Sequence, residues 1–120
     1  MKKLLLSALL LGGCASGQTT YTHLSHDEAK DFMEQEECIV LDVRTSAEFE
    51  DGHIPNAILL PVDQVKDKAE EVLPDRESQI LIYCRSGRRA LKAAQHLVDM
   101  GYSHVYEFGG IIDWPYDIVQ

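Results

Sequence analysis

The sequence predicts an α/β domain with a central, mostly parallel sheet of five strands and helices on both faces. Two apolar runs, residues 39–43 and 80–83, have strand length and few polar positions, as expected for strands that are buried on both faces. Segments with helix-capping residues and helical spacing lie between the apolar runs. Strands that alternate with helices along a chain are typical of a parallel sheet covered on both sides.

The predicted strands are short runs rich in apolar and β-branched residues. One of them is closed by Pro61, and the second long run ends in Cys84. Ligands of parallel α/β sheets bind beyond the carboxyl ends of the strands, where the sequence places Asp42, Arg44 and Cys84. In chain order the predicted strands are residues 20–24, 39–43, 58–60, 80–83 and 104–106.

The predicted helices are bounded by residues that usually begin and end helices. Capping boxes formed by Ser25 with Glu28 and by Thr45 with Glu48 indicate two helix starts. Gly101 indicates a helix end, because glycine readily adopts the left-handed conformation found there. The predicted helices are residues 25–35, a short helix from 45, residues 63–72 and residues 88–100.

The first thirteen residues have the layout of a secretory signal. Lys2 and Lys3 precede an apolar run at 4–11, and small residues precede Cys14. Eight helical residues reach only about 12 Å, far less than the roughly 30 Å of a bilayer core, so no transmembrane span is expected. We therefore expect a signal at 1–13, a tether at 14–20 and one folded domain at 21–120.

The segment Leu11-Gly-Gly-Cys14 resembles the lipobox of bacterial lipoproteins. The resemblance implies cleavage before Cys14, acylation of Cys14 and anchoring to a membrane, because several acyl chains give stable attachment. It also implies a location in the bacterial cell envelope, facing the periplasm or the outside. An ordinary signal peptide with an incidental cysteine is the alternative interpretation.

The chain is acidic. It has 11 Lys and Arg against 20 Asp and Glu, a net charge of −9. Without Lys2 and Lys3, 9 basic residues remain and the net charge is −11. This charge argues against nucleic acid as a partner, because nucleic-acid binding depends on clustered Lys and Arg. It also makes the one local cluster of arginines, at 85–89, informative.

That cluster belongs to a loop that favours nucleophilic chemistry. The thiol of Cys84 is predicted to lie between the end of a buried strand and the start of a helix, whose free N–H groups favour a negative charge. A tight turn at Gly87 can direct further amides at the sulfur. The predicted loop, which stabilises thiolate over thiol, consists of Cys84, Arg85, Ser86, Gly87, Arg88 and Arg89.

The length of this loop separates two classes of enzyme. Low-molecular-weight and dual-specificity tyrosine phosphatases require an arginine after five intervening residues, and position 90 is Ala90. Arg89 comes one residue too early. A phosphatase or arsenate reductase is therefore disfavoured, and the shorter loop suits one additional sulfur atom on Cys84 better than a phosphoryl group.

Residues 21–113 resemble a single-domain rhodanese, closest in pattern to the small periplasmic phage-shock type. One departure is Asn56, which follows Pro55 where the family usually has glycine, although asparagine also tolerates a left-handed backbone. The resemblance depends on five motifs in order: Leu-Asp-Val-Arg at 41–44, Glu-Phe at 48–49, Gly-His-Ile-Pro-Asn-Ala at 52–57, the loop 84–89, and Gly-Gly at 109–110 before Asp-Trp at 113–114.

The resemblance implies a thiosulfate sulfurtransferase. The Cys84 thiolate would take the outer sulfur of an anionic donor, release sulfite and hold a persulfide, which cyanide or a thiol acceptor then removes. The loop amides would hold the persulfide, while Arg85, Arg88 and Arg89 would attract the donor. Asp42 and Arg44 would hold loops in place or touch the substrate.

No metal, organic cofactor or nucleic acid is implied, and we expect a monomer. His23 and His26 lie near Asp27 but have no further ligand cluster to indicate a metal site. Cys38 begins its strand whereas Cys84 ends one, so in a parallel sheet they lie at opposite edges, too far apart for a disulfide. We expect Cys38 to be a buried core thiol. The alternative function is a sulfur-carrier or partner-binding module with little turnover on free thiosulfate.

Overall fold

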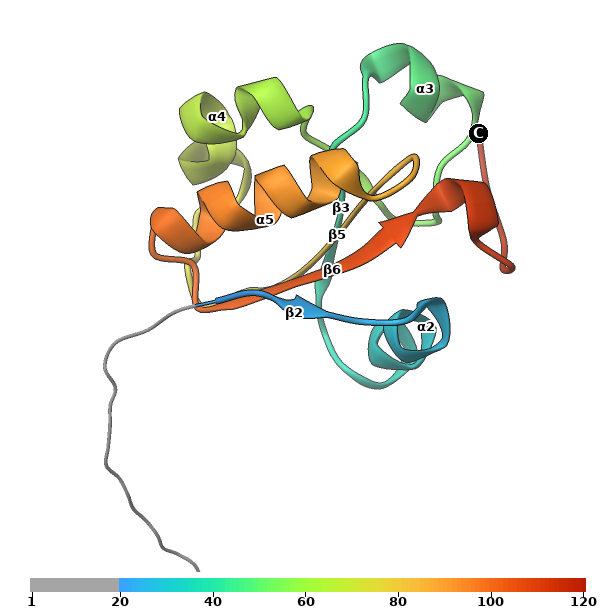
Figure 1. The fold of residues 1–120 in the computed structure, drawn as a ribbon, viewed down its shortest axis with the longest axis horizontal. Coiled ribbons are helices and arrows are strands. Elements are labelled where there is room, and N and C mark those ends of the chain that lie inside the picture. Colours follow the sequence, from blue (N-terminus) through green and yellow to red (C-terminus); the bar gives the residue numbers. More distant parts are fainter. Residues whose placement is uncertain (1–19) are drawn as a thin grey trace, which may run out of the picture.

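The computed structural model describes residues 20–120 (Figure 1). The expected signal at 1–13, Cys14 and the tether up to residue 19 lie outside the described residues. Within residues 20–120, no helix combines the length and the apolar character needed to cross a membrane.

The centre of the fold is a five-stranded sheet with the strand order β2-β6-β5-β3-β4. All four strand pairs are parallel, so the prediction of a mostly parallel five-stranded sheet is confirmed. Within residues 20–120, one antiparallel bridge outside these strands joins His53 to Val119. The strands are β2 Thr22–His23, β3 Ile39–Asp42, β4 Ile58–Leu59, β5 Gln79–Cys84 and β6 His104–Gly110.

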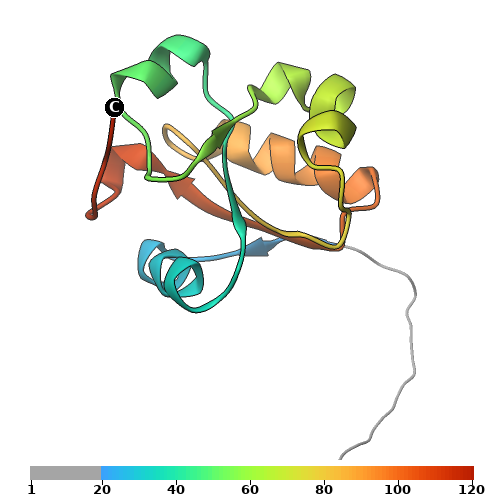
Figure 2. The ribbon, with the colours of Figure 1, turned by 180° about the vertical axis from the view of Figure 1, so that it is seen from behind.

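Helices cover both faces of this sheet (Figures 1 and 2). Helices α4 (Val65–Val72) and α5 (Arg88–Asp99) lie on one face, and α2 (His26–Gln35) lies on the other. The short helix α3 (Ser46–Asp51) follows the carboxyl end of β3. Both predicted capping boxes are present, because the Ser25 and Thr45 side chains accept hydrogen bonds from the N–H groups of Glu28 and Glu48.

Two hydrophobic clusters flank the sheet, and β5 contributes to both. Ile80 and Ile82 pack into the cluster with α4 and α5, whereas Leu81 and Tyr83 pack into the cluster on the α2 side. This alternation follows from the strand geometry, in which successive side chains point to opposite faces. Cys84 continues the series of Ile80 and Ile82, so its thiol lies on the α5 side of the sheet.

The last strand corrects a prediction made from the sequence. Strand β6 continues beyond residue 106 to Gly110 and pairs there with Cys84, after a register shift in β5. Glycine has a low strand propensity, so the strand predicted from the sequence ended too early, at residue 106. The predicted helix 63–72 also differs, since it begins as the 3-10 turn η2 (Val62–Gln64), which leads into α4. A second 3-10 turn, η3 (Ile111–Asp113), follows β6.

Candidate active site

Cys84 lies at the carboxyl end of β5, directly before the turn into α5. The residue is 1% exposed, and its Sγ accepts a hydrogen bond from the Gly87 N–H at 3.0 Å. The Ala90 N–H lies 3.4 Å from the same sulfur. These amides come from the cap and the first turn of α5, where backbone N–H groups have no partner within the helix. The cradle therefore presents partial positive charge to the sulfur.

Gly87 gives the turn its shape. Its φ of 115° lies in the left-handed region, which side chains strongly disfavour. A Cβ at this residue would also lie 3.5 Å from the Cα of Gly109 on β6. The loop thus lies close to the end of β6, and the left-handed backbone of Gly87 turns its chain into the start of α5 while its amide donates to the sulfur.

The three arginines of the loop have different surroundings. Arg89 makes a two-pronged ion pair with Glu48 of α3, at 2.8 Å between Nη1 and Oε1 and 3.0 Å between Nη2 and Oε2. This contact with Arg89 lowers the pKa of the Glu48 carboxyl to about 2. Arg85 and Arg88 are exposed and make no ion pair with any residue in the 20–120 range. Ser86 is also exposed.

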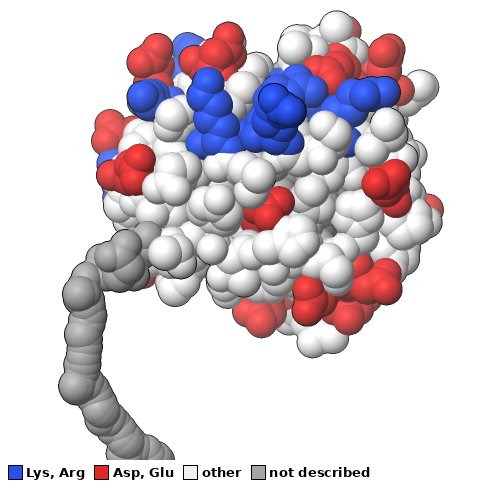
Figure 3. Space-filling view, viewed as in Figure 1, with Lys and Arg blue, Asp and Glu red and all other residues white. Residues whose placement is uncertain are grey.

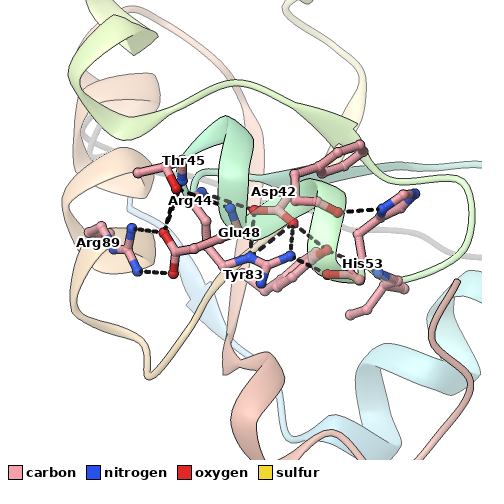
Figure 4. Close-up of polar contacts among 10 residues, drawn as sticks. Asp42, Arg44, Thr45, Glu48, His53, Tyr83 and Arg89 are labelled. Carbon is pink, nitrogen blue, oxygen red and sulfur yellow. Dashed lines mark hydrogen bonds and ion pairs between the residues drawn. The ribbon is translucent and has the colours of Figure 1, made fainter. Parts of the chain in front are cut away.

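Asp42 and Arg44 form a buried ion pair at the end of β3 (Figure 4). The closest contact, from Arg44 Nη2 to Asp42 Oδ2, is 2.7 Å. Arg44 is 5% exposed and Asp42 is 0% exposed. Arg44 also donates to the Gly52 carbonyl at 2.8 Å. The pair therefore links strand β3 to the turn that follows α3.

Tyr83 extends this network to β5. Its hydroxyl donates to Asp42 Oδ2 at 2.6 Å and accepts from the Ile54 N–H at 3.1 Å. Burial, together with the hydrogen bond to Asp42, raises the pKa of Tyr83. Since Tyr83 directly precedes Cys84, the network fixes the strand end that carries the thiol. Sequence reasoning missed this tyrosine because its partners lie 29 and 41 residues away.

Glu107 is a second residue that sequence reasoning missed. It is 4% exposed on β6, and its carboxylate accepts from the Gly109 N–H at 3.0 Å. The other carboxylate oxygen lies 2.5 Å from His23 Nδ1. Its signal in the sequence is a carboxylate between two aromatic residues, Tyr106 and Phe108. Within residues 20–120, no group of three His, Cys, Asp or Glu side chains could hold a metal ion.

Cys38 corrects another expectation. It is half-buried rather than fully buried, and it lies directly before β3, where it lines a pocket with Asp75 and residues 77–79. Burial raises the pKa of its thiol, which disfavours the reactive thiolate. Both Cys38 and Cys84 are free thiols in the structure.

The arrangement suits a cysteine nucleophile that carries a small anionic group. Two backbone amides contact the sulfur, and the loop closes at residue 89 against Glu48. A thiolate, or a second sulfur bonded to it, would be stabilised by these donors in the same way as an anion at a helix start.

Comparisons with known proteins agree with this description. Residues 25–115 match the family model of the rhodanese-like domain. The thiosulfate sulfurtransferase GlpE of Coxiella burnetii is 34% identical over 95 residues, which cover 78% of this chain and 87% of that protein. The thiosulfate sulfurtransferase PspE of Escherichia coli is 34% identical over 73 residues, or 61% of this chain and 70% of that protein.

A solved structure described as a rhodanese with anions from E. coli superimposes with a TM-score of 0.66. Its sequence is 31% identical to this one, and the superposition covers 70% of this chain and 99% of the chain in that structure. The family model covers most of the described residues, and the relatives share more than 30% identity. The chain therefore belongs to the rhodanese family.

Proposed function

We propose that this rhodanese-family chain moves a sulfane sulfur from thiosulfate, or a similar anionic donor, to cyanide or a thiol through a persulfide on Cys84. The observation that carries the proposal is the pair of amides, Gly87 N–H and Ala90 N–H, directed at a buried sulfur. The relatives named thiosulfate sulfurtransferase support the same reaction.

The reaction takes two displacements. In the first, the Cys84 thiolate attacks the outer sulfur of thiosulfate, and the sulfur–sulfur bond of the donor breaks. Sulfite leaves with the bonding electron pair. In the second, cyanide or a thiolate attacks the outer sulfur of the persulfide, and Cys84 leaves as a thiolate. The amides that contact Sγ stabilise the thiolate that begins and ends the cycle, and the neighbouring amides of the loop would face the outer, anionic sulfur of the persulfide.

The surroundings of each residue suggest its role. Arg85 and Arg88, which are exposed and unpaired among residues 20–120, would attract the sulfonate end of the donor. Arg89 is engaged by Glu48, so its role is to position the start of α5. The backbone at Ser86 and Gly87 would surround the transferred sulfur. Asp42 and Arg44 would support the loops, because their polar contacts go to each other, to Tyr83 and to Gly52.

The cellular setting is a further part of the proposal. The basic start, the apolar run and the Leu-Gly-Gly-Cys segment support a lipid anchor on Cys14 and a location in the cell envelope. A monomer held by this anchor would then act on donors and acceptors near the membrane. No organic cofactor or metal is needed for either displacement.

Mass spectrometry of the purified protein tests the reaction. Incubation with thiosulfate should add about 32 Da, one sulfur atom, to the peptide that contains Cys84, and cyanide should remove it. The variant Cys84→Ser should lose both the adduct and turnover. The matched control, Cys38→Ser, should keep both. Turnover that survives Cys84→Ser, or that stops in a folded Cys38→Ser protein, would place the chemistry elsewhere.

A further inference from the structure

Cationic side chains continue from the active-site loop along the surface of α5 to α4. Arg88 and Lys92 lie four residues apart on α5, and Lys66 lies on α4. With Arg85 they form what we call the cationic ridge: Arg85, Arg88, Lys92 and Lys66. All four are exposed, and none pairs with a carboxylate in the part of the chain that the structure describes.

A groove of about 520 Å³ lies between α4 and α5 at the far end of the ridge. Lys66 and Lys92 line it together with His96, Gln95, Asp99 and Met100. Burial and the proximity of the two lysines lower the pKa of His96, as expected where positive groups converge. Leu91, which directly precedes Lys92 on α5, is 43% exposed and adds apolar surface beside the charges.

The ridge opposes the charge of the rest of the molecule. Residues 20–120 contain all 20 acidic residues and 9 of the 11 basic ones. Figure 3 shows Lys and Arg side chains in a band over α5, with acidic side chains above this band, on the side of α3 and α4, and others over α2 on the lower side. The band is thus a local strip of positive charge on an acidic surface, and such a strip can orient an anionic partner toward the Cys84 loop beside it.

The ridge is longer than a small anionic donor requires. Lys92 lies about 6 Å farther along the helix axis than Arg88, and Lys66 belongs to the neighbouring helix. A thiosulfate ion at Cys84 would contact only the loop. The additional cations therefore suit a partner with an extended negative surface.

We propose that the cationic ridge docks an acidic protein whose exposed thiol receives sulfur from Cys84, an inference that rests on the proposed function. The partner's thiolate would attack the outer sulfur of the Cys84 persulfide, forming a new sulfur–sulfur bond on the partner. Cys84 would leave as a thiolate with the electron pair. The ridge adjoins Cys84, which is 1% exposed and would carry the sulfur to be transferred. A lipid surface has no thiol that could accept this sulfur, so a thiol-bearing protein fits the ridge better than an anionic membrane does.

Two synthetic peptides provide the test. Each has one cysteine, which is flanked by Glu and Asp in one peptide and by Gln and Ser in the other. The protein is first loaded with thiosulfate, and the Cys84 persulfide is verified by mass. Transfer to each peptide is then timed. We expect the acidic peptide to react about tenfold faster in about 0.01 M salt, and the advantage to vanish in about 1 M salt, where charges are screened.

Matched charge reversals locate the effect. Lys92→Glu and Lys30→Glu change the net charge equally, but Lys30 lies on α2, on the other face of the sheet. Lys92→Glu should slow transfer to the acidic peptide at least threefold in low salt and leave the neutral peptide unaffected, a rate ratio that steering can supply. Lys30→Glu should change the transfer rate to neither peptide. The double variant Lys66→Glu/Lys92→Glu should remove the remaining preference.

Each outcome has one meaning. If thiosulfate forms no persulfide on Cys84, the proposed function fails. If the persulfide forms but both peptides react equally, or if Lys30→Glu matches Lys92→Glu, the docking inference alone is overturned. Binding to phosphatidylglycerol vesicles that Lys92→Glu abolishes, without any peptide preference, would overturn it in favour of a membrane surface.

Discussion

The backbone carbonyl of Arg85 lies where a side chain on Gly110 would begin: a Cβ at residue 110 would be 1.9 Å from that oxygen. Such a Cβ would also lie 2.6 Å from the Ser86 amide nitrogen. Because these atoms are backbone, no side-chain rotation can relieve the overlap. The end of β6 and the active-site loop can therefore approach this closely only if residue 110 is glycine.

We predict that Gly110→Ala displaces the loop and reduces persulfide formation on Cys84 by at least tenfold. Overpacking of this kind typically costs about 1–3 kcal/mol, and here the cost falls on the loop that carries the amides. Gly109→Ala is the control. It has an unfavourable φ of 81°, yet its nearest contact with an added Cβ is His26 at 3.9 Å. Equal persulfide formation in the two folded variants would contradict the prediction.

Tyr83→Phe removes one hydroxyl that serves two buried groups. The Asp42 carboxylate loses a donor, and the Ile54 N–H loses its acceptor. An unsatisfied buried polar group costs about 1–3 kcal/mol, so we expect the free energy of unfolding to fall by about 2–3 kcal/mol. Urea titration measures this change.

Tyr102→Phe is the matched control, because that buried hydroxyl donates only to backbone carbonyls, those of Leu73 at 2.6 Å and Ala69 at 3.2 Å. We expect its cost to be about 1 kcal/mol, the typical net value of one hydrogen bond. A larger loss in Tyr102→Phe than in Tyr83→Phe would show that the network around Asp42 is not exceptional.

Local patterns in the sequence account for most of the fold. The buried strand β5, both capping boxes and the start of α5 after Gly87 each depend on residues within a few positions of one another. Periodicity and capping therefore predict them correctly. The position of Cys84 follows directly, because it depends only on the end of one strand.

Features that depend on distant segments could not be predicted in this way. Arg89 meets Glu48 across 41 residues, so its engagement was hidden among three similar arginines. The extension of β6 to Gly110 depends on pairing with Cys84 of β5, a partner 26 residues away that overrides the poor strand propensity of glycine. The partial exposure of Cys38 depends on the pocket that it lines with Asp75 and residues 77–79, which are about 40 positions away along the chain.

The ion pair between Glu48 and Arg89 predicts a pH dependence of stability. The pKa of Glu48 is lowered in the folded protein from 4.5 to about 2, so its contribution is complete above about pH 4.5. The contribution is lost as the pH falls from about 4.5 to about 2. Allowing for solvent screening, we expect it to be about 1–2 kcal/mol.

Glu48→Gln should therefore flatten the stability curve in this pH window, as measured by denaturant titration at several pH values. Glu34→Gln is the control, since Glu34 forms an exposed pair with Lys30 within α2, and such pairs contribute little. Parallel curves for Glu48→Gln and the unmodified protein would show that the pair does not stabilise the fold.

Cys14→Ser tests the expected lipid anchor. If Cys14 is acylated, the full chain produced in bacteria should partition into the detergent phase, and the variant should move to the aqueous phase. The reason is that several acyl chains, each methylene contributing about 0.8 kcal/mol, hold a protein on a membrane. Cys38→Ser should leave the partition unchanged. A fully aqueous native protein that is cut at another residue would contradict the anchor.

The length of the loop should determine which group the cysteine accepts. One glycine inserted between Arg88 and Arg89 would give the phosphatase spacing, but Arg89 already binds Glu48 and α5 begins at Arg88. The insertion must therefore break that ion pair or move the amides away from Cys84 Sγ.

We expect this insertion to reduce sulfur transfer at least a hundredfold, comparable to losing a donor to a developing anion, with at most a trace of aryl-phosphate hydrolysis. A glycine inserted between Glu77 and Ser78, in the turn before β5, is the control and should retain sulfur transfer. Sulfur transfer at the original rate in the folded loop variant would mean that loop length does not select the sulfur atom.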